Sequence, residues 1–218
     1  MKRKGITTLA GALVLLTLFA NTHVFGRTIS LRANDMDMMA AIVEEGPRHS
    51  WVSYTAEGAN GIYRVNPILI SLTHSFLFRF SLEKIPKGQR ITNAELSIKL
   101  GATSKGARIF IWRIVADWGP GVNHIYRMQR PKAVAWALPG ARANSSDRAT
   151  KPSAMLSTTE AGEQVINLTE DVELWYSGAA HNYGWQISSE DTDAYFLLSI
   201  PVTEIQDNWE LRVTYEPQ

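Results

Sequence analysis

Residues 76–118 read FLFRFSLEKIPKGQRITNAELSIKLGATSKGARIFIWRIVADW and hold three apolar runs separated by turn-forming residues. The middle run, 94–100, alternates apolar with polar side chains, and this period of two places one face of a β-strand on a core. The first run, 76–82, also alternates, which predicts that the face with Arg79 and Ser81 is solvated. The third run, 108–115, is apolar on both faces and predicts a strand covered on both sides or lining a groove. IPKG and LGATSKGA between the runs are turn material. The stretch therefore predicts antiparallel β-structure.

The rest of the chain carries further short strand-like runs and one helical pattern. Residues 169–176 predict one or two helical turns, in which Thr169 caps the first turn and Val172, Trp175 and Tyr176 share one side. About ten short strands with turns between them are typical of an all-β fold. With 218 residues, 45% of them hydrophobic, the chain can bury one sizeable core. We predict a two-sheet antiparallel β-sandwich, a jelly roll, with a long ordered loop and at most one or two short helices.

The first 26 residues form a separate segment with Lys2, Arg3 and Lys4 before an apolar stretch. This pattern predicts a secretory signal peptide over residues 1–26, followed by a single domain over 27–218, and an uncleaved anchor is the alternative. Removal of the segment leaves 19 basic and 21 acidic residues, so no global charge argues for nucleic acid. We expect a secreted or cell-surface protein with no membrane insertion after cleavage.

The sequence lacks the patterns of several enzyme classes. It contains no cysteine, which excludes thiol catalysis and thiolate metal sites. It has no HExxH or GxSxG motif and no glycine-rich phosphate loop. The one cluster that suits a polysaccharide lyase is Tyr126 and Arg127 with His124 nearby. Catalysis is therefore the least favoured of the functions considered.

The long loop 119–147 combines aromatic and cationic side chains. Aromatic rings pack on the apolar C–H faces of sugars, and arginine binds uronate or sulfate oxygens in a bidentate manner. The alternative is that the tryptophans are core residues beneath the loop and the arginines are solvated. A second candidate is the two-sided strand, which carries Trp112 and Arg113. The candidate ligand-binding residues are thus Trp118, Tyr126, Arg127, Arg130, Trp136, Trp112 and Arg113.

An acidic cluster at residues 190–193 suggests one metal site. Glu190, Asp191 and Asp193 provide the oxygen ligands that calcium takes from irregular loops. A charged hairpin tip explains the same residues. A structural calcium ion at this turn is therefore an expectation that competes with a purely solvated turn, and no other cofactor is indicated.

Several segments together carry a family resemblance. In chain order these are LFRF, IPKGQRITNAELSIKL, FIWRIVADW, WALPGA at 136–141, VINLTEDVELWYSGAAHNYGWQIS and the C-terminal WELRVTYEP. The chain resembles, over roughly residues 29–217, the DNRLRE-type domain, a secreted β-sandwich related to the alginate-binding carbohydrate-binding module family 96. The resemblance implies a non-catalytic extracellular domain that accompanies polysaccharide-degrading enzymes or surface proteins.

These observations leave three functional expectations. The first is a secreted, non-catalytic carbohydrate-binding module for an acidic polysaccharide such as alginate. The second is a structural or adhesive protein of the cell envelope or matrix that binds protein partners. The third is a polysaccharide lyase. The sequence does not fix the oligomeric state.

Overall fold

The computed structural model describes residues 26–44, 51–55, 68–100, 107–158, 161–190, 196–198 and 209–218. In these residues, two antiparallel sheets pack face to face as a sandwich, with one short α-helix, α1 (Thr169–Tyr176), and a single 3-10 turn, η1 (Ala33–Asp35), so the predicted fold class is confirmed. The predicted signal segment lies outside the described residues, apart from Gly26. Within the described part of the chain, no helix has the length and apolar character needed to span a membrane.

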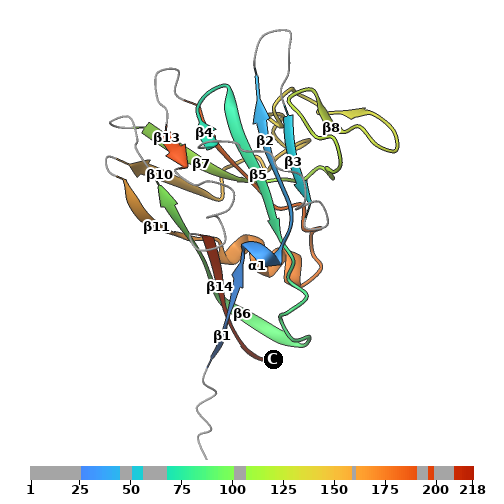
Figure 1. The fold of residues 1–218 in the computed structure, drawn as a ribbon. Helices are drawn as coiled ribbons and strands as arrows, with labels where there is room; N and C mark the ends of the chain where they lie inside the picture. Colours follow the sequence, from blue (N-terminus) through green and yellow to red (C-terminus); the bar gives the residue numbers. More distant parts are fainter. Residues whose placement is uncertain are drawn as a thin grey trace, which may run out of the picture.

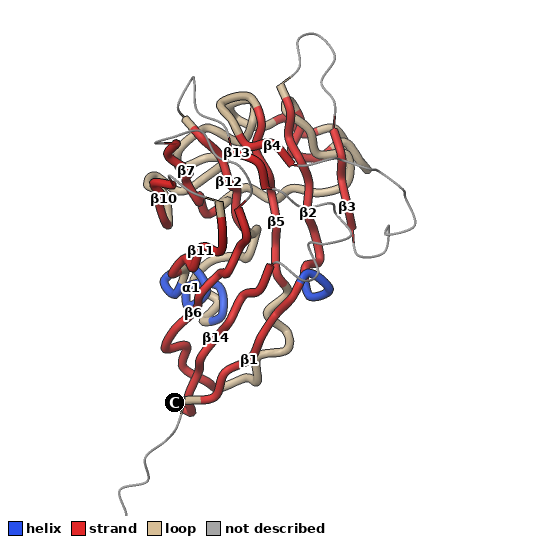
Figure 2. Tube along the Cα trace, turned by 60° about the vertical axis from the view of Figure 1, so that its left-hand side comes forward, coloured by secondary structure: helices blue, strands red, loops and turns tan. Residues whose placement is uncertain are grey.

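The four-stranded sheet has the order β1-β14-β6-β11, and the six-stranded sheet has the order β10-β7-β12-β5-β2-β3 (Figures 1 and 2). The strands of the first sheet are β1 (Arg27–Arg32), β14 (Trp209–Pro217), β6 (Gln89–Leu100) and β11 (Gly162–Asn167). Those of the second are β10 (Ala154–Thr158), β7 (Ala107–Arg113), β12 (Trp185–Ser189), β5 (His74–Phe80), β2 (Met36–Val43) and β3 (Trp51–Thr55). Two small pairs join β13 (Phe196–Leu198) to β4 (Ile68–Ile70) and β8 (Tyr126–Met128) to β9 (Val134–Ala135).

Strand order identifies the sandwich as a jelly roll. Taking β1, β5, β6, β7, β10, β11, β12 and β14 as strands one to eight, the sheets have the orders 1-8-3-6 and 5-4-7-2. This alternation between sheets is the double Greek-key arrangement of the jelly roll. The hairpin of β2 and β3 extends the second sheet beyond β5.

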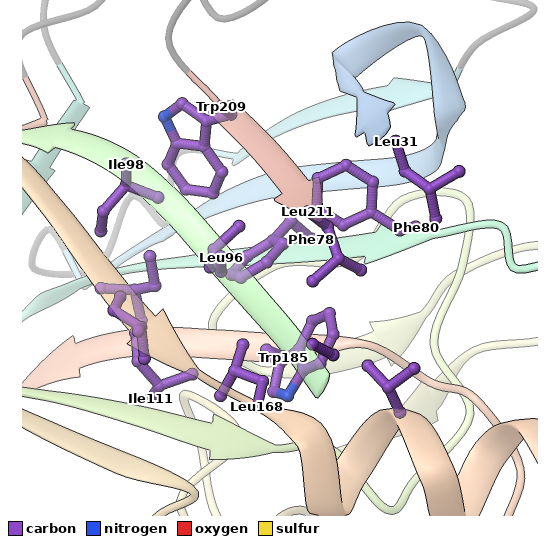
Figure 3. Close-up of a cluster of buried hydrophobic side chains, with 14 of the residues drawn as sticks. Leu31, Phe78, Phe80, Leu96, Ile98, Ile111, Leu168, Trp185, Trp209 and Leu211 are labelled. Carbon is purple, nitrogen blue, oxygen red and sulfur yellow. The ribbon is translucent and has the colours of Figure 1, made fainter. Parts of the chain in front are cut away.

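The main core lies between the two sheets. Phe76, Phe78 and Phe80 of β5 are fully buried and face Trp209 and Leu211 of β14, as Figure 3 shows for the side chains that it labels. The rings of Phe78 and Trp209 meet edge to face, with centroids 5.0 Å apart. The alternation over 94–100 is confirmed, because its apolar side chains all enter this core.

A second apolar cluster lies on the outer face of the six-stranded sheet. Trp118, Val122, Trp136 and Ala141 pack there against Leu77 of β5 and three side chains of β2, namely Met38, Ala40 and Ile42. The 119–147 loop, predicted to be ordered, therefore covers one face of this sheet as a third layer (Figure 1, where β8 lies to the right of β2 and β3). This cover buries Leu77, so the prediction that one face of run 76–82 is solvated is wrong.

The helix α1 forms where the sequence predicts it, but its first turn is capped differently. Leu168 occupies the N-cap position and makes no side-chain capping bond. The hydroxyl of Thr169 instead accepts the backbone N–H of Ala94, 2.8 Å away. Val172 and Trp175 are buried as expected, and Tyr176 packs against the same core.

Candidate functional site

The structure contains a surface pocket of about 460 Å³ between the 119–147 loop and the end of strand β7. Its lining residues include an arginine, two aspartates, a serine and a tyrosine together with small apolar residues. The lining residues are Val115, Ala116, Asp117, Arg127, Val134, Ala135, Ala137, Ser146, Asp147 and Tyr183.

Asp147 holds one wall of this pocket together. Its carboxylate is 1% exposed and accepts three backbone N–H groups, those of Ala137 at 2.8 Å, Leu138 at 2.9 Å and Ala143 at 3.1 Å. The backbone carbonyl of Asp147 accepts the N–H of Val115 at 2.9 Å, which connects the same residue to the strand β7 side. Asp147 is therefore a positioning residue, and both of its carboxylate oxygens are already engaged by the backbone.

Arg127 is placed in the pocket by its own strand and by the preceding turn. It lies in β8, and its carbonyl accepts the N–H of Gly119 at 2.9 Å. Its guanidinium donates one hydrogen bond to the carbonyl oxygen of Asp117. Since a guanidinium carries five N–H donors, Arg127 retains donors for a ligand. The Asp117 residue is exposed at the pocket.

Tyr183 reaches the pocket from the loop that precedes β12. The amide of Asn182 donates to the carbonyl of Phe80 at 2.9 Å, and its side-chain oxygen accepts the N–H of Gly184 at 3.0 Å. The indole N–H of Trp118 donates to the carbonyl of Tyr183 at 2.7 Å. These bonds fix the backbone on both sides of the Tyr183 ring, which is half-buried.

The three predicted tryptophans are core residues in the structure. Trp118, Trp136 and Trp112 are 1%, 4% and 5% exposed. The indole N–H of Trp136 donates to the carbonyl of Asn123 at 2.9 Å, and the ring of Trp112 is covered by the guanidinium of Arg148 at 3.6 Å. Their ring faces pack against protein, as the packing alternative predicts, so none of them presents a free ring face to a sugar.

The predicted cations are not gathered at one site. Arg113 is paired with the buried Asp171 at 2.9 Å, and this carboxylate also accepts the indole N–H of Trp185 at 2.7 Å. Burial raises the pKa of Asp171, against the opposing effect of these partners. Arg130 is exposed and does not line the pocket, whereas Arg127 does. Tyr126, its neighbour in β8, is half-buried and also lies outside the pocket lining.

The predicted calcium ligands are only partly described. Glu190 accepts a hydrogen bond from Arg148 at 2.9 Å, so its charge is opposed by a buried cation. Burial lowers the pKa of the Arg148 guanidinium, whereas the hydrogen bond that it donates to Glu190 raises it. Asp191 and Asp193 lie outside the described residues. Among the residues that are described, no group of three or more acidic or histidine side chains could hold a metal ion.

The cluster considered for a lyase is dispersed by the fold. His124 is buried beneath the loop, where its carbonyl accepts the N–H of Gly140 at 2.7 Å, and its ring lies 3.9 Å from the carboxylate of Glu44. Arg127 lines the pocket without His124. The described residues that line the pocket therefore include neither Tyr126 nor His124, the two bases that this cluster offered.

Asp117, Ser146 and Asp147 are pocket residues that the sequence does not single out. Asp117 belongs to the ADW segment, which draws attention through its tryptophan rather than through its carboxylate. No local sequence pattern identifies Asp147 as a pocket residue, because the backbone N–H groups that donate to its carboxylate lie four to ten residues earlier in the chain.

Comparison with known proteins gave no relative: the sequence matches no protein-family model and no curated protein.

Proposed function

We propose that this protein is a secreted, non-catalytic polysaccharide-binding domain whose ligand occupies the pocket between the 119–147 loop and β7. The observation that carries the proposal is the composition of that pocket. Its volume of about 460 Å³ lies within the usual range of small-molecule sites, which runs from roughly 300 to 1,000 Å³. It places one aromatic ring beside several polar groups of different hydrogen-bonding character.

The lining suits the chemistry of a sugar ring. Tyr183 packs against the second apolar cluster but is only half-buried, so the part that lines the pocket can contact the C–H face of a pyranose, and its backbone is fixed on both sides. Arg127 supplies donors, Asp117 supplies acceptors and Ser146 supplies both. Because a sugar presents hydroxyls that donate and accept, this mixture can bind it without a metal or a catalytic group.

The resemblance to DNRLRE-type domains supports the same proposal. Two of the segments that carry it, ADW and NYG, supply Asp117 and Tyr183 to the pocket. The jelly roll alone carries no such weight, since this fold hosts many functions. Secretion rests on the charged and apolar pattern of residues 1–26.

Affinity electrophoresis through gels that contain neutral or anionic polysaccharides tests the proposal. We expect at least one polysaccharide to retard the protein, with or without a calcium chelator. Arg127→Ala should weaken retardation by about tenfold in affinity, the effect of one charge-assisted hydrogen bond. Arg130→Ala is the matched control, because it removes the same charge from the same loop outside the pocket. Free mobility in every gel would disprove the proposal.

A second candidate function is protein binding at the envelope or matrix. Met155 and Val165 are 55% and 58% exposed, and they lie on the edge strands β10 and β11 of the two sheets. Exposed edge strands can pair with strands of other chains. Sedimentation with a cell-surface extract tests this candidate. Co-sedimentation with an extract component that Val165→Lys abolishes would support it. A protein that sediments as a monomer both with and without the extract would exclude it.

A further inference from the structure

We infer that the pocket selects an uncharged sugar, bound through its hydroxyl groups, rather than the uronate or sulfate group of an acidic polysaccharide. This inference rests on the proposed function and specifies the chemical class of its ligand. It differs from the expectation drawn from sequence, an acidic polysaccharide, which rested on the family resemblance and on the aromatic and basic residues of the 119–147 loop.

Most of those arginines are engaged within the protein. Arg148 binds Glu190 at 2.9 Å and stacks on an indole ring, while Arg142 donates to the carbonyl of Leu72 and lies 3.9 Å from Glu44. Arg113, on strand β7, is paired with Asp171. None of these three guanidinium groups lines the pocket. An anionic ligand would therefore meet fewer cations than the sequence suggests.

Among the described residues that line the pocket, negative charges outnumber positive ones. Arg127 contributes one positive charge, and Asp117 and Asp147 contribute two negative charges. The carboxylate of Asp147 is buried, bound by three backbone N–H groups and in electrostatic interaction with Arg148, so an approaching anion meets chiefly the charge of the exposed Asp117. Arg127 is itself hydrogen-bonded to the backbone of Asp117.

The same groups suit neighbouring hydroxyls. An ionised carboxylate only accepts hydrogen bonds, so an exposed Asp117 can take two O–H donors from one sugar ring. Arg127 can then donate a hydrogen bond to the oxygen of a hydroxyl whose hydrogen points to Asp117. Ser146 can act as donor or as acceptor. A uronate carboxylate offers no hydrogen to Asp117 and would face it across the pocket as a like charge.

Exposed cations elsewhere on the loop could still attract acidic chains without specificity. Arg130 and Lys132 are exposed and lie outside the pocket lining. Attraction of this kind is screened within about 10 Å at 0.1 M salt, so it weakens as salt is added. Binding in the pocket through hydroxyl groups should change little over the same range.

The test is calorimetric titration of the full chain with six matched hexasaccharides. Three are neutral (cello-, manno- and xylohexaose) and three are anionic (hexamers of mannuronate, guluronate and galacturonate). We expect a neutral hexasaccharide to bind at least tenfold more tightly than any anionic one at 0.15 M salt. Asp117→Asn should reduce that affinity about tenfold, whereas Glu173→Gln, which removes an exposed charge on α1, should leave it unchanged.

The outcomes separate this inference from the function on which it rests. If an anionic hexasaccharide binds more tightly than every neutral one, and Arg127→Ala weakens that binding, the inference of an uncharged ligand is wrong but polysaccharide binding in the pocket is supported. Unchanged affinity in Asp117→Asn would also overturn it. Absence of heat with all six, together with free mobility in every polysaccharide gel, would overturn both proposals.

Discussion

Replacing Asp147 with alanine should loosen the wall of the pocket and destabilise the protein. The buried carboxylate accepts the backbone N–H groups of Ala137, Leu138 and Ala143 over 2.8 to 3.1 Å. Hydrogen bonds to a charged group contribute about 1.5–3 kcal/mol each. Three at the lower limit give about 4.5 kcal/mol, and water that reaches the exposed residues Ala137 and Leu138 reduces the expected loss to about 3 kcal/mol.

Thermal and urea unfolding measure this loss. For a domain of this size, about 3 kcal/mol corresponds to a fall in melting temperature of roughly 6–12 °C. The stability of Asp147→Asn should lie between those of the wild type and Asp147→Ala. Its amide oxygen can keep the two hydrogen bonds now made by Oδ2, whereas its NH₂ group faces the N–H of Ala137 and cannot accept from it. Asp117→Asn is the control: its residue is exposed, so stability should remain within about 0.5 kcal/mol of wild type. A loss below 1 kcal/mol in Asp147→Ala would refute this account of the loop.

Two further predictions concern the helix and the turn beside the pocket. Gly184 has a φ of 77°, and an added Cβ would collide with the carbonyl oxygen of Phe78, whereas Gly178 has a φ of 78° and open space. Chemical denaturation should therefore show Gly184→Ala to be about 2 kcal/mol less stable than Gly178→Ala, and equal stabilities would contradict the close packing. Burial raises the pKa of Asp171 above 3.8, so the folded state binds this proton more tightly than the unfolded state. The contribution of Asp171 to the free energy of unfolding should therefore fall as the pH rises from about 3.8 through the folded pKa. Unfolding curves measured over this pH range should lack that fall in Asp171→Asn. An identical pH dependence in both proteins would show that Asp171 does not cause it.

The sequence predicts the sheets well where the pattern is local. The alternation over 94–100 identifies the inward face of β6, and the two-sided run at 108–115 identifies β7, which is covered by the core on one side and by the loop residue Arg148 over Trp112 on the other. The same reasoning misplaces Leu77, because alternation within one strand carries no information about a third layer formed 40 or more residues later.

The candidate site could be placed on the 119–147 loop, but its members could not be chosen from sequence. A tryptophan is equally suited to a sugar and to a core, and the N–H groups of Trp118 and Trp136 are bound by backbone carbonyls that no sequence pattern identifies. The arginines present the same difficulty, because their partners are distant in the chain: 42 residues separate Arg148 from Glu190. Asp147 holds the loop through backbone groups, which have no residue signature.

Amide chemical-shift mapping with a neutral hexasaccharide tests the central claim, polysaccharide binding in this pocket, most directly. We predict that saturable shifts concentrate on the pocket residues, including Asp117, Arg127 and Tyr183, and that Arg127→Ala weakens them while Arg130→Ala does not. Shifts confined to the outer face of the four-stranded sheet, around Glu95 and Arg212, would contradict it.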